Sequence, residues 1–191
     1  MAKPDYSAFL APAQLEIEEA AWAEAAHERE QAELTRMTLD ENGLVSLVEF
    51  GCATGWLPHY LGDRFQYLGI DANLDCIARA RAKNPARLFL ADDVRTARAP
   101  QADLVAAFAL LKHFHLSEWE AVLFRILHYG RYGLFNMTVA KRSYEDDFDF
   151  PHVWISPERL RKAVEAAGHE IIGTPWGEEP DTEWMVLTRR R

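Results

Sequence analysis

The chain has 191 residues, a formal net charge of -9 and a hydrophobic content of 49%, including six tryptophans. That length and composition predict one folded domain with a full core, and the acidic charge argues against a nucleic-acid surface, which needs basic residues to meet phosphates. The longest apolar stretch, residues 104–111, is too short to cross a membrane, and the two cysteines lack metal-ligand spacing. We therefore expect a cytoplasmic protein that has no membrane or nucleic-acid partner.

The N-terminal part is expected to form a helical extension. Residues 12–37 are rich in Ala and Glu, which are good helix formers, and Pro12 suits a first helical turn. We expect residues 1–40 to form this extension and residues 41–191 to form the main domain. The sequence leaves open whether the extension covers a site as a lid, packs on the edge of a sheet or pairs with a second copy in a homodimer.

Strand-like and helix-like segments alternate through the rest of the chain. Apolar runs predict seven strands, at residues 44–50, 65–70, 87–91, 103–108, 132–139, 169–174 and 183–188. Prolines and capping residues predict helices from Trp56, over 74–83 after Asn73, over 118–128 behind the capping box Ser117-x-x-Glu120, and from Ser156-Pro157 to Gly168. This alternation predicts an α/β fold with a doubly wound, mostly parallel seven-stranded sheet, three αβα layers and an antiparallel terminal strand.

The turn after the first strand of this domain is the most informative motif. The strand carries Glu49 near its end and leads into Gly51-Cys52-Ala53-Thr54-Gly55, whose small residues allow a tight bend and a close approach of backbone to a ligand. The second strand ends in Asp71, where a carboxylate suits the two hydroxyls of a ribose. The pair predicts a nucleotide-type cofactor site at the carboxyl ends of parallel strands.

The glycine spacing disfavours two common nucleotide cofactors. A dinucleotide fingerprint G-x-G-x-x-G would place its third glycine at Trp56, whose side chain would block close packing of helix on strand. The phosphate loop G-x-x-x-x-G-K-[ST] does not occur in the sequence. NAD and ATP therefore fit poorly.

The motif Glu49-x-Gly51-x-Ala53-x-Gly55 resembles the first motif, E/D-x-G-x-G-x-G, of class I S-adenosylmethionine-dependent methyltransferases, with alanine at the middle glycine. Residues 91–94 resemble the third motif of that family and residues 103–114 its fourth strand and the following turn, so the resemblance covers residues 44 to 189. It implies S-adenosyl-L-methionine as cofactor, with Asp71 on the ribose hydroxyls, Asp92 on the adenine amino group and the backbone near Asp93 at the ring nitrogens. The cofactor-binding residues that it implies are Glu49, Phe50, Gly51, Cys52, Ala53, Gly55, Asp71, Ala72, Asp92, Asp93, Val94, Phe108 and Ala109.

Histidines are the candidates for a general base. Methyl transfer is a direct displacement, so a base is needed only where the acceptor arrives protonated. His113 and His115 follow the fourth strand, and His152 lies in the segment 140–156. We expect His113 and His152 to be the catalytic candidates, with His113 first by its place in the family string, against the alternative that each histidine is structural.

The segment 140–156 is predicted to be a long loop that contacts the substrate. Its aromatic side chains could line an apolar pocket, and its aspartates at 146, 147 and 149 could attract a cationic acceptor. The alternative is a surface loop whose aromatics dock on the core. The predicted substrate-binding residues are Tyr144, Asp149, Phe150, His152 and Trp154.

Several absences and one basic cluster narrow the function. The string Asn/Asp-Pro-Pro-Tyr of adenine and glutamine N-methyltransferases does not follow the fourth strand, and the metal-binding acids of catechol-type enzymes are unmatched there. The residues show no metal-ligand cluster, so no metal is expected. The basic residues at 79, 81, 83 and 87 are expected to form a solvated helix face.

Three functional hypotheses follow from these motifs. The first is an S-adenosylmethionine-dependent methyltransferase that acts on a small molecule through oxygen or nitrogen. The second is a catalytically silent binding or regulatory protein of the same fold, motivated by alanine at position 53. The third, a dinucleotide oxidoreductase, is disfavoured by the glycine spacing.

Overall fold

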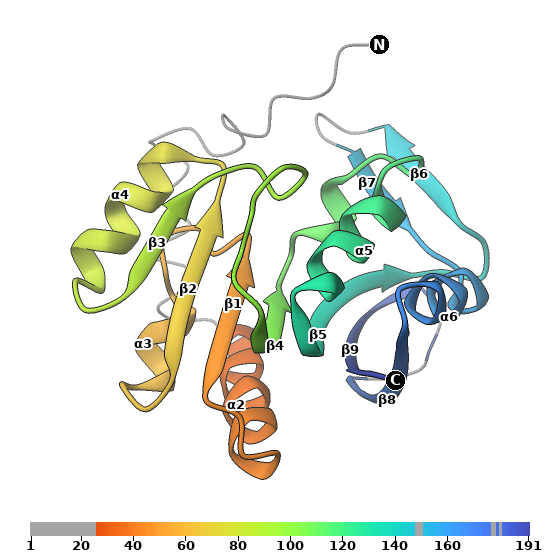
Figure 1. The fold of residues 1–191 in the computed structure, drawn as a ribbon. Helices are drawn as coiled ribbons and strands as arrows, with labels where there is room; N and C mark the ends of the chain where they lie inside the picture. Colours follow the sequence, from red (N-terminus) through yellow and green to blue (C-terminus); the bar gives the residue numbers. More distant parts are fainter. Residues whose placement is uncertain (1–25, 148–150, 177–178, 180) are drawn as a thin grey trace. The chain divides into compact units, whose positions relative to one another are not determined.

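The computed structural model describes residues 26–147, 151–176, 179 and 181–191. The chain divides into two compact units, one ending at Arg98 and one beginning at Ala99 (Figure 1). The first half of the helix predicted over 12–37 lies outside the described residues.

The described part of the first unit contains three parallel strands and three helices. Its strands β1 (Ser46–Phe50), β2 (Gln66–Asp71) and β3 (Leu88–Ala91) pair in the order β3-β2-β1. The register sets Phe50 opposite Ile70 and Asp71 opposite Ala91, so all three strands end at the same edge. The edge therefore collects the three segments that the sequence singled out in this half of the chain.

The described helices of the first unit are α2 (Ala26–Glu41), α3 (Leu57–Leu61) and α4 (Leu74–Lys83). Asn73 caps α4 as predicted, because its side chain accepts hydrogen bonds from the backbone N–H groups of Asp75 (2.9 Å) and Cys76 (3.1 Å). Helix α2 continues four residues beyond the expected end at Met37 and is followed by Gly43, whose φ of 62° no longer suits a helix. It contacts α3 and buries Leu39 completely.

The second unit holds the remaining strands of the main sheet. Its strands β4 (Ala102–Ala107), β5 (Gly130–Val139), β8 (His169–Trp176) and β9 (Thr182–Arg190) run in the order β4-β5-β9-β8. Strand β4 is parallel to β5, and β9 is antiparallel to both of its neighbours. The predicted antiparallel terminal strand is therefore confirmed, and it lies between β5 and β8.

The helices of the second unit are η2 (Leu111–His113), α5 (Trp119–His128) and α6 (Pro157–Ala166). Ser156 caps α6 as predicted, accepting from the backbone N–H of Arg159 at 3.4 Å. The capping box predicted for α5 is wrong: the helix begins after Glu118, which makes no side-chain cap hydrogen bond. Glu120 instead forms an ion pair with Arg159 at 2.6 Å, a stronger partner than a backbone N–H.

The segment 140–156 contains a β-hairpin, so its prediction as a loop was wrong. Strands β6 (Tyr144–Asp147) and β7 (Pro151–Trp154) pair antiparallel, with Tyr144 opposite Trp154 and Asp146 opposite His152. Val153 on the other face is fully buried, which fixes the register of the hairpin. The strands are short and β6 is acidic, so the sequence gave only a weak strand pattern, which the burial of Val153 outweighs.

The described strands follow the order β3-β2-β1 in the first unit and β4-β5-β9-β8 in the second. Helices connect most of the successive strands, as the alternating pattern predicted. The chain thus has the predicted α/β fold with a mostly parallel seven-stranded sheet.

Candidate functional site

The turn after β1 adopts a conformation that exposes backbone. Gly51 and Gly55 have φ values of 75° and 74°, and Ala53 also has a positive φ of 45°. The N–H groups of Gly51 and Cys52 donate to the carbonyl of Ile70, at 2.8 and 3.2 Å, which anchors the turn on β2. The residues therefore form a tight, glycine-dependent turn at the strand edge, as the motif predicted.

Asp71 joins this turn to the end of β2. Its Oδ2 accepts from the N–H of Ala53 at 2.9 Å, and its Oδ1 accepts from the N–H of Asn73 at 2.8 Å. Burial raises the pKa of Asp71, although both hydrogen bonds oppose that shift. Two motifs that are separate in sequence are thus held together by one carboxylate, which retains further lone pairs for a ligand.

Glu49 lies fully buried under the same edge. Its Oε2 accepts from the hydroxyl of Tyr67, while its Oε1 has no hydrogen-bond partner among the described residues. Burial raises the pKa of Glu49 to about 8, against the hydrogen bond from Tyr67, and the charge of Asp71 adds to the shift. An orphaned carboxyl oxygen in a fully buried residue needs a donor, and a ligand can supply it.

The other predicted residues of the first unit differ in what they offer a ligand. The side chains of Phe50 and Cys52 are buried in the core, so only their backbone can face a cofactor. Asp92 donates its N–H to the carbonyl of Asp71 at 3.0 Å, which places it beside the end of β2. Asp93 forms an ion pair with Arg95, so its carboxylate is already engaged.

The end of β4 is shaped by a residue that the sequence did not reveal. Ala109 has a positive φ of 50°, and its N–H donates to Oδ1 of the buried Asn136 at 2.6 Å. Asn136 lies in the middle of β5, a mostly apolar strand that also contains Arg131 and Thr138. The only sign of its role is that it lies opposite the end of β4, and that position is known only once the register of the sheet is known.

The two predicted catalytic histidines lie together in the second unit. His113 ends η2 and His152 lies on β7, with ring centroids 6.0 Å apart and an interplanar angle of 74°. Nε2 of His152 is buried without a hydrogen-bond partner in the described part of the chain. Residues 39 positions apart in sequence, which were chosen separately, thus form one pair.

Charged side chains surround this histidine pair. Burial lowers the pKa of His152 and Lys112 lowers it further, while Asp146 and Glu183 act in the opposite direction. Lys112 itself forms an ion pair with Glu183 at 3.0 Å. A lowered pKa keeps His152 neutral near pH 7, the state in which an imidazole can accept a proton.

One face of the hairpin carries a row of stacked rings. Trp154 stacks on Tyr144 at 5.9 Å and 12°, and on His152 at 5.5 Å and 22°. The indole N–H of Trp154 donates to Asp146 at 2.8 Å. Three of the predicted substrate residues therefore lie on one surface, while Asp149 and Phe150 lie outside the described residues.

His115 has a structural role. Its Nδ1 lies 2.6 Å from Oε1 of Glu145, and Oε2 of Glu145 accepts from the N–H of Leu116 at 2.8 Å. These contacts fasten the hairpin to the segment before α5. They also lower the pKa of Glu145 against the effect of its partial burial.

Among the four basic residues of this segment, Arg81 and Lys83 are exposed, as the expected solvated face predicts, while Arg79 and Arg87 are partly buried. Arg81 donates to the carbonyl of Phe89 at 2.7 Å, and Arg87 donates to the carbonyl of Phe65 at 2.5 Å. Lys83 lies 3.4 Å from the hydroxyl of Thr54 in the turn. Cations that satisfy backbone carbonyls in this way stabilise the first unit.

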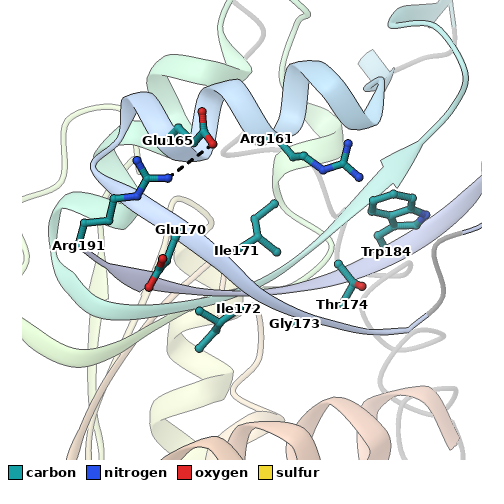
Figure 2. A pocket seen from close by; sticks show the side chains of 9 residues that line it. All are labelled: Arg161, Glu165, Glu170, Ile171, Ile172, Gly173, Thr174, Trp184 and Arg191. Carbon is teal, nitrogen blue, oxygen red and sulfur yellow. Dashed lines mark ion pairs between the residues drawn. The ribbon is translucent and has the colours of Figure 1, made fainter.

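A pocket of about 470 Å³ lies on α6, β8 and β9 of the second unit (Figure 2). The residues that line it are Arg161, Glu165, Glu170, Ile171, Ile172, Gly173, Thr174, Trp184 and Arg191. Glu165 and Arg191 form an ion pair at 3.5 Å across it (Figure 2). None of the predicted site residues lines this pocket, so it is distinct from the candidate site.

The described residues show neither a metal-ligand cluster nor a membrane-spanning helix. They contain no group of three or more His, Cys, Asp or Glu side chains that could hold a metal ion. None of their helices is both long and apolar enough to cross a bilayer.

Comparison with known proteins identifies the class. A family model described as a methyltransferase domain matches residues 21–173, so the chain belongs to the family of methyltransferase domains. The family resemblance inferred from the first motif is confirmed. No curated protein matches the sequence.

Solved structures of methyltransferases share the fold at low sequence identity. Magnesium protoporphyrin IX methyltransferase from Synechocystis PCC 6803, solved with bound S-adenosylmethionine, has 17% identity and a TM-score of 0.69 over 86% of this chain and 80% of its own. The amino pentose methyltransferase CalS10 from Micromonospora echinaspora has 16% identity and a TM-score of 0.72, with 92% and 97% covered. A Burkholderia thailandensis N1-methyltransferase of 1,6-didemethyltoxoflavin has 14% identity and a TM-score of 0.70, with 93% and 84% covered. These similarities establish the fold, and the named acceptors differ widely.

Proposed function

We propose that this methyltransferase transfers the methyl group of S-adenosylmethionine to oxygen or nitrogen of a small molecule. The observation that carries the proposal is the double hydrogen bond of Asp71, which joins the glycine turn to the end of β2. A carboxylate in that position, beside a turn with exposed backbone, suits the ribose of an adenosine. The family membership supplies the reaction class.

The residues of the first unit fit this cofactor. The orphaned oxygen of Glu49 offers an acceptor to an ammonium group, and the turn from Gly51 to Gly55 lets backbone approach a ligand closely. Asp71 and Asp92 offer acceptors to hydroxyl and amino groups. When bound, S-adenosylmethionine supplies a methyl group activated by its sulfonium, and it has no phosphate that would need a cationic cradle.

The second unit carries the residues that we assign to the acceptor. Tyr144, Trp154 and His152 form a row of stacked rings that suits an apolar or flat acceptor surface. His152 is the better base candidate of the two histidines, because its buried Nε2 lacks a partner and its pKa is lowered. It would take the proton from a hydroxyl or ammonium acceptor as the new bond to carbon forms.

Binding and turnover test this proposal separately. Calorimetry with S-adenosylmethionine and its demethylated product should detect binding below 1 mM, and its absence in a folded chain would contradict the proposal. Gly51→Val provides a matched control, because a β-branched residue strains the positive φ of 75° and blocks approach of the backbone. That variant should keep its sheet and lose binding.

Turnover decides between an enzyme and a silent binding protein. The chain would be incubated with cofactor labelled in the methyl group and a panel of hydroxyl and amine acceptors. Any enzyme-dependent methylated product eliminates the silent alternative. His152→Gln should then lower the rate for protonated acceptors by about 10²–10⁴-fold and leave cofactor affinity unchanged.

A further inference from the structure

Glu49 and Tyr67 form a buried pair beneath the glycine turn. Glu49 is 0% exposed and Tyr67 is 6% exposed, and the phenol donates to Oε2 of the carboxyl. The second oxygen, Oε1, has no hydrogen-bond partner among the described residues. Leaving a buried polar atom without a partner is costly, so this atom calls for a hydrogen-bond partner that a bound ligand can supply.

The surroundings of the pair hold Tyr67 in one place. Its ring packs edge-on against Phe89, with centroids 5.6 Å apart. Gly69 has no side chain here, and a Cβ at that position would lie 2.8 Å from both the Tyr67 hydroxyl and Sγ of Cys52. The phenol is therefore closely confined and keeps the carboxyl of Glu49 in a fixed orientation.

The titratable groups near the pair favour a neutral carboxyl. Asp71 on β2 repels a negative charge on Glu49. Burial raises the pKa of the Cys52 thiol in the turn, and the charges of Glu49 and Asp71 raise it further. Arg87 lowers the pKa of Tyr67, and Cys76 on α4 acts on Cys52. No described cation hydrogen-bonds to Glu49.

We propose that Tyr67 is a positioning residue that presents Oε1 of Glu49 to the ammonium group of the cofactor, and that binding of this group displaces a proton from Glu49. The proposal rests on the proposed function, because it takes S-adenosylmethionine as the ligand. The carboxyl O–H bond breaks, its proton passes to the solvent, and an ammonium N–H···Oε1 hydrogen bond forms.

The sign of the pH dependence follows from the chemistry. Burial raises the pKa of Glu49 to about 8, so the free protein holds the proton at neutral pH. A cation beside the carboxylate lowers that pKa, so the deprotonated form binds more tightly. Affinity should therefore rise by about 20-fold between pH 6.0 and pH 7.5, and it should stop rising near pH 8, where the ligand's own α-amino group begins to lose its proton.

Calorimetry on the full chain tests proton release directly. Binding of S-adenosylmethionine would be measured at pH 7.0 in buffers with different ionisation enthalpies, and the dependence of the observed enthalpy on the buffer gives the number of protons released. The wild-type chain should release close to one proton. Glu49→Gln should release fewer, and its affinity should vary less between pH 6.0 and pH 7.5, because that variant reports only the titration of the ligand and other groups.

Tyr67→Phe tests the positioning role. Loss of one hydrogen bond should weaken binding by about tenfold while proton release persists, since Glu49 stays buried. Tyr132→Phe, at a similarly buried tyrosine of β5, should keep the wild-type affinity. Urea unfolding of each variant shows that it is folded before binding is compared.

The outcomes separate this inference from the proposed function. If the folded wild-type chain fails to bind cofactor at every pH, the proposed function is wrong. If it binds without proton release and with equal affinity across the pH range, only the displacement of the Glu49 proton is overturned. Wild-type affinity in Tyr67→Phe would overturn the positioning role.

Discussion

Removing the carboxylate of Asp71 should destabilise the first unit. The side chain accepts two backbone hydrogen bonds, from Ala53 at 2.9 Å and from Asn73 at 2.8 Å. Each bond to a charged acceptor contributes about 1.5–3 kcal/mol, and partial access of water to the freed N–H groups favours the lower end. Asp71→Ala should therefore lower the free energy of unfolding by about 2–4 kcal/mol.

Urea unfolding measures that change, with Asp75→Ala as a matched control. Asp75 is an exposed carboxylate in the first turn of α4, where its charge favours the helix by about 0.3–1 kcal/mol. A loss below about 0.5 kcal/mol in Asp71→Ala, with an unchanged denaturant slope, would refute the role assigned to the carboxylate.

The same substitution should weaken cofactor binding. Loss of a pair of charge-assisted hydrogen bonds to the ribose should cost about 2–4 kcal/mol, or about 30- to 1,000-fold in affinity. Asn73→Ala separates stability from binding, because it removes the cap of α4 and leaves the Asp71 carboxylate in place. Unchanged affinity in a folded Asp71→Ala variant would contradict a ribose contact.

Three further substitutions test local features by urea unfolding. Ser156→Ala should lower the free energy of unfolding by about 1 kcal/mol, because it removes the cap of α6. Ser117→Ala should change that free energy by less than about 0.5 kcal/mol. Equal losses in the two variants would show that Ser117 does cap α5. Ala53→Gly should gain about 0.5–1 kcal/mol by relieving a positive φ of 45°, and a loss would show that alanine is unstrained there. Burial lowers the pKa of His169, so the unfolded chain binds a proton there more readily than the folded chain. The stability that the neutral His169 contributes is therefore fully present above pH 6.5 and is lost as the pH falls below that value. His169→Gln should flatten that loss between pH 7 and pH 5, and an equally steep loss in the variant would assign it to other groups.

The local pattern of the sequence was enough to predict the elements of the main sheet. Apolar runs located the strands, and Asn73 and Ser156 marked helix starts, because both signals depend on residues that are near neighbours in the chain. The turn at Gly51 and the carboxylate of Asp71 were likewise predictable from spacing. The hairpin was missed because its strands are only four residues long and one of them, β6, is mostly acidic.

Contacts between distant residues could not be predicted from the sequence. The pairing of Glu49 with Tyr67 and of Lys112 with Glu183 depends on the register of neighbouring strands and on packing. The capping box failed for the same reason, since Glu120 found a partner in Arg159 on another helix. Spacing identifies residue types at strand ends, while their partners emerge only in three dimensions.

The position of β9 between β5 and β8 has a consequence for the order of assembly during synthesis. Among the described strands of the sheet, β8 is hydrogen-bonded only to β9, which follows it along the chain. The ribosome therefore releases β8 before its neighbour exists, and β5 presents an unsatisfied backbone edge for the same interval. The pairing of β5 and β8 with β9 must wait until β9 has been synthesised, so the nascent chain carries two strands with unpaired backbone edges until then.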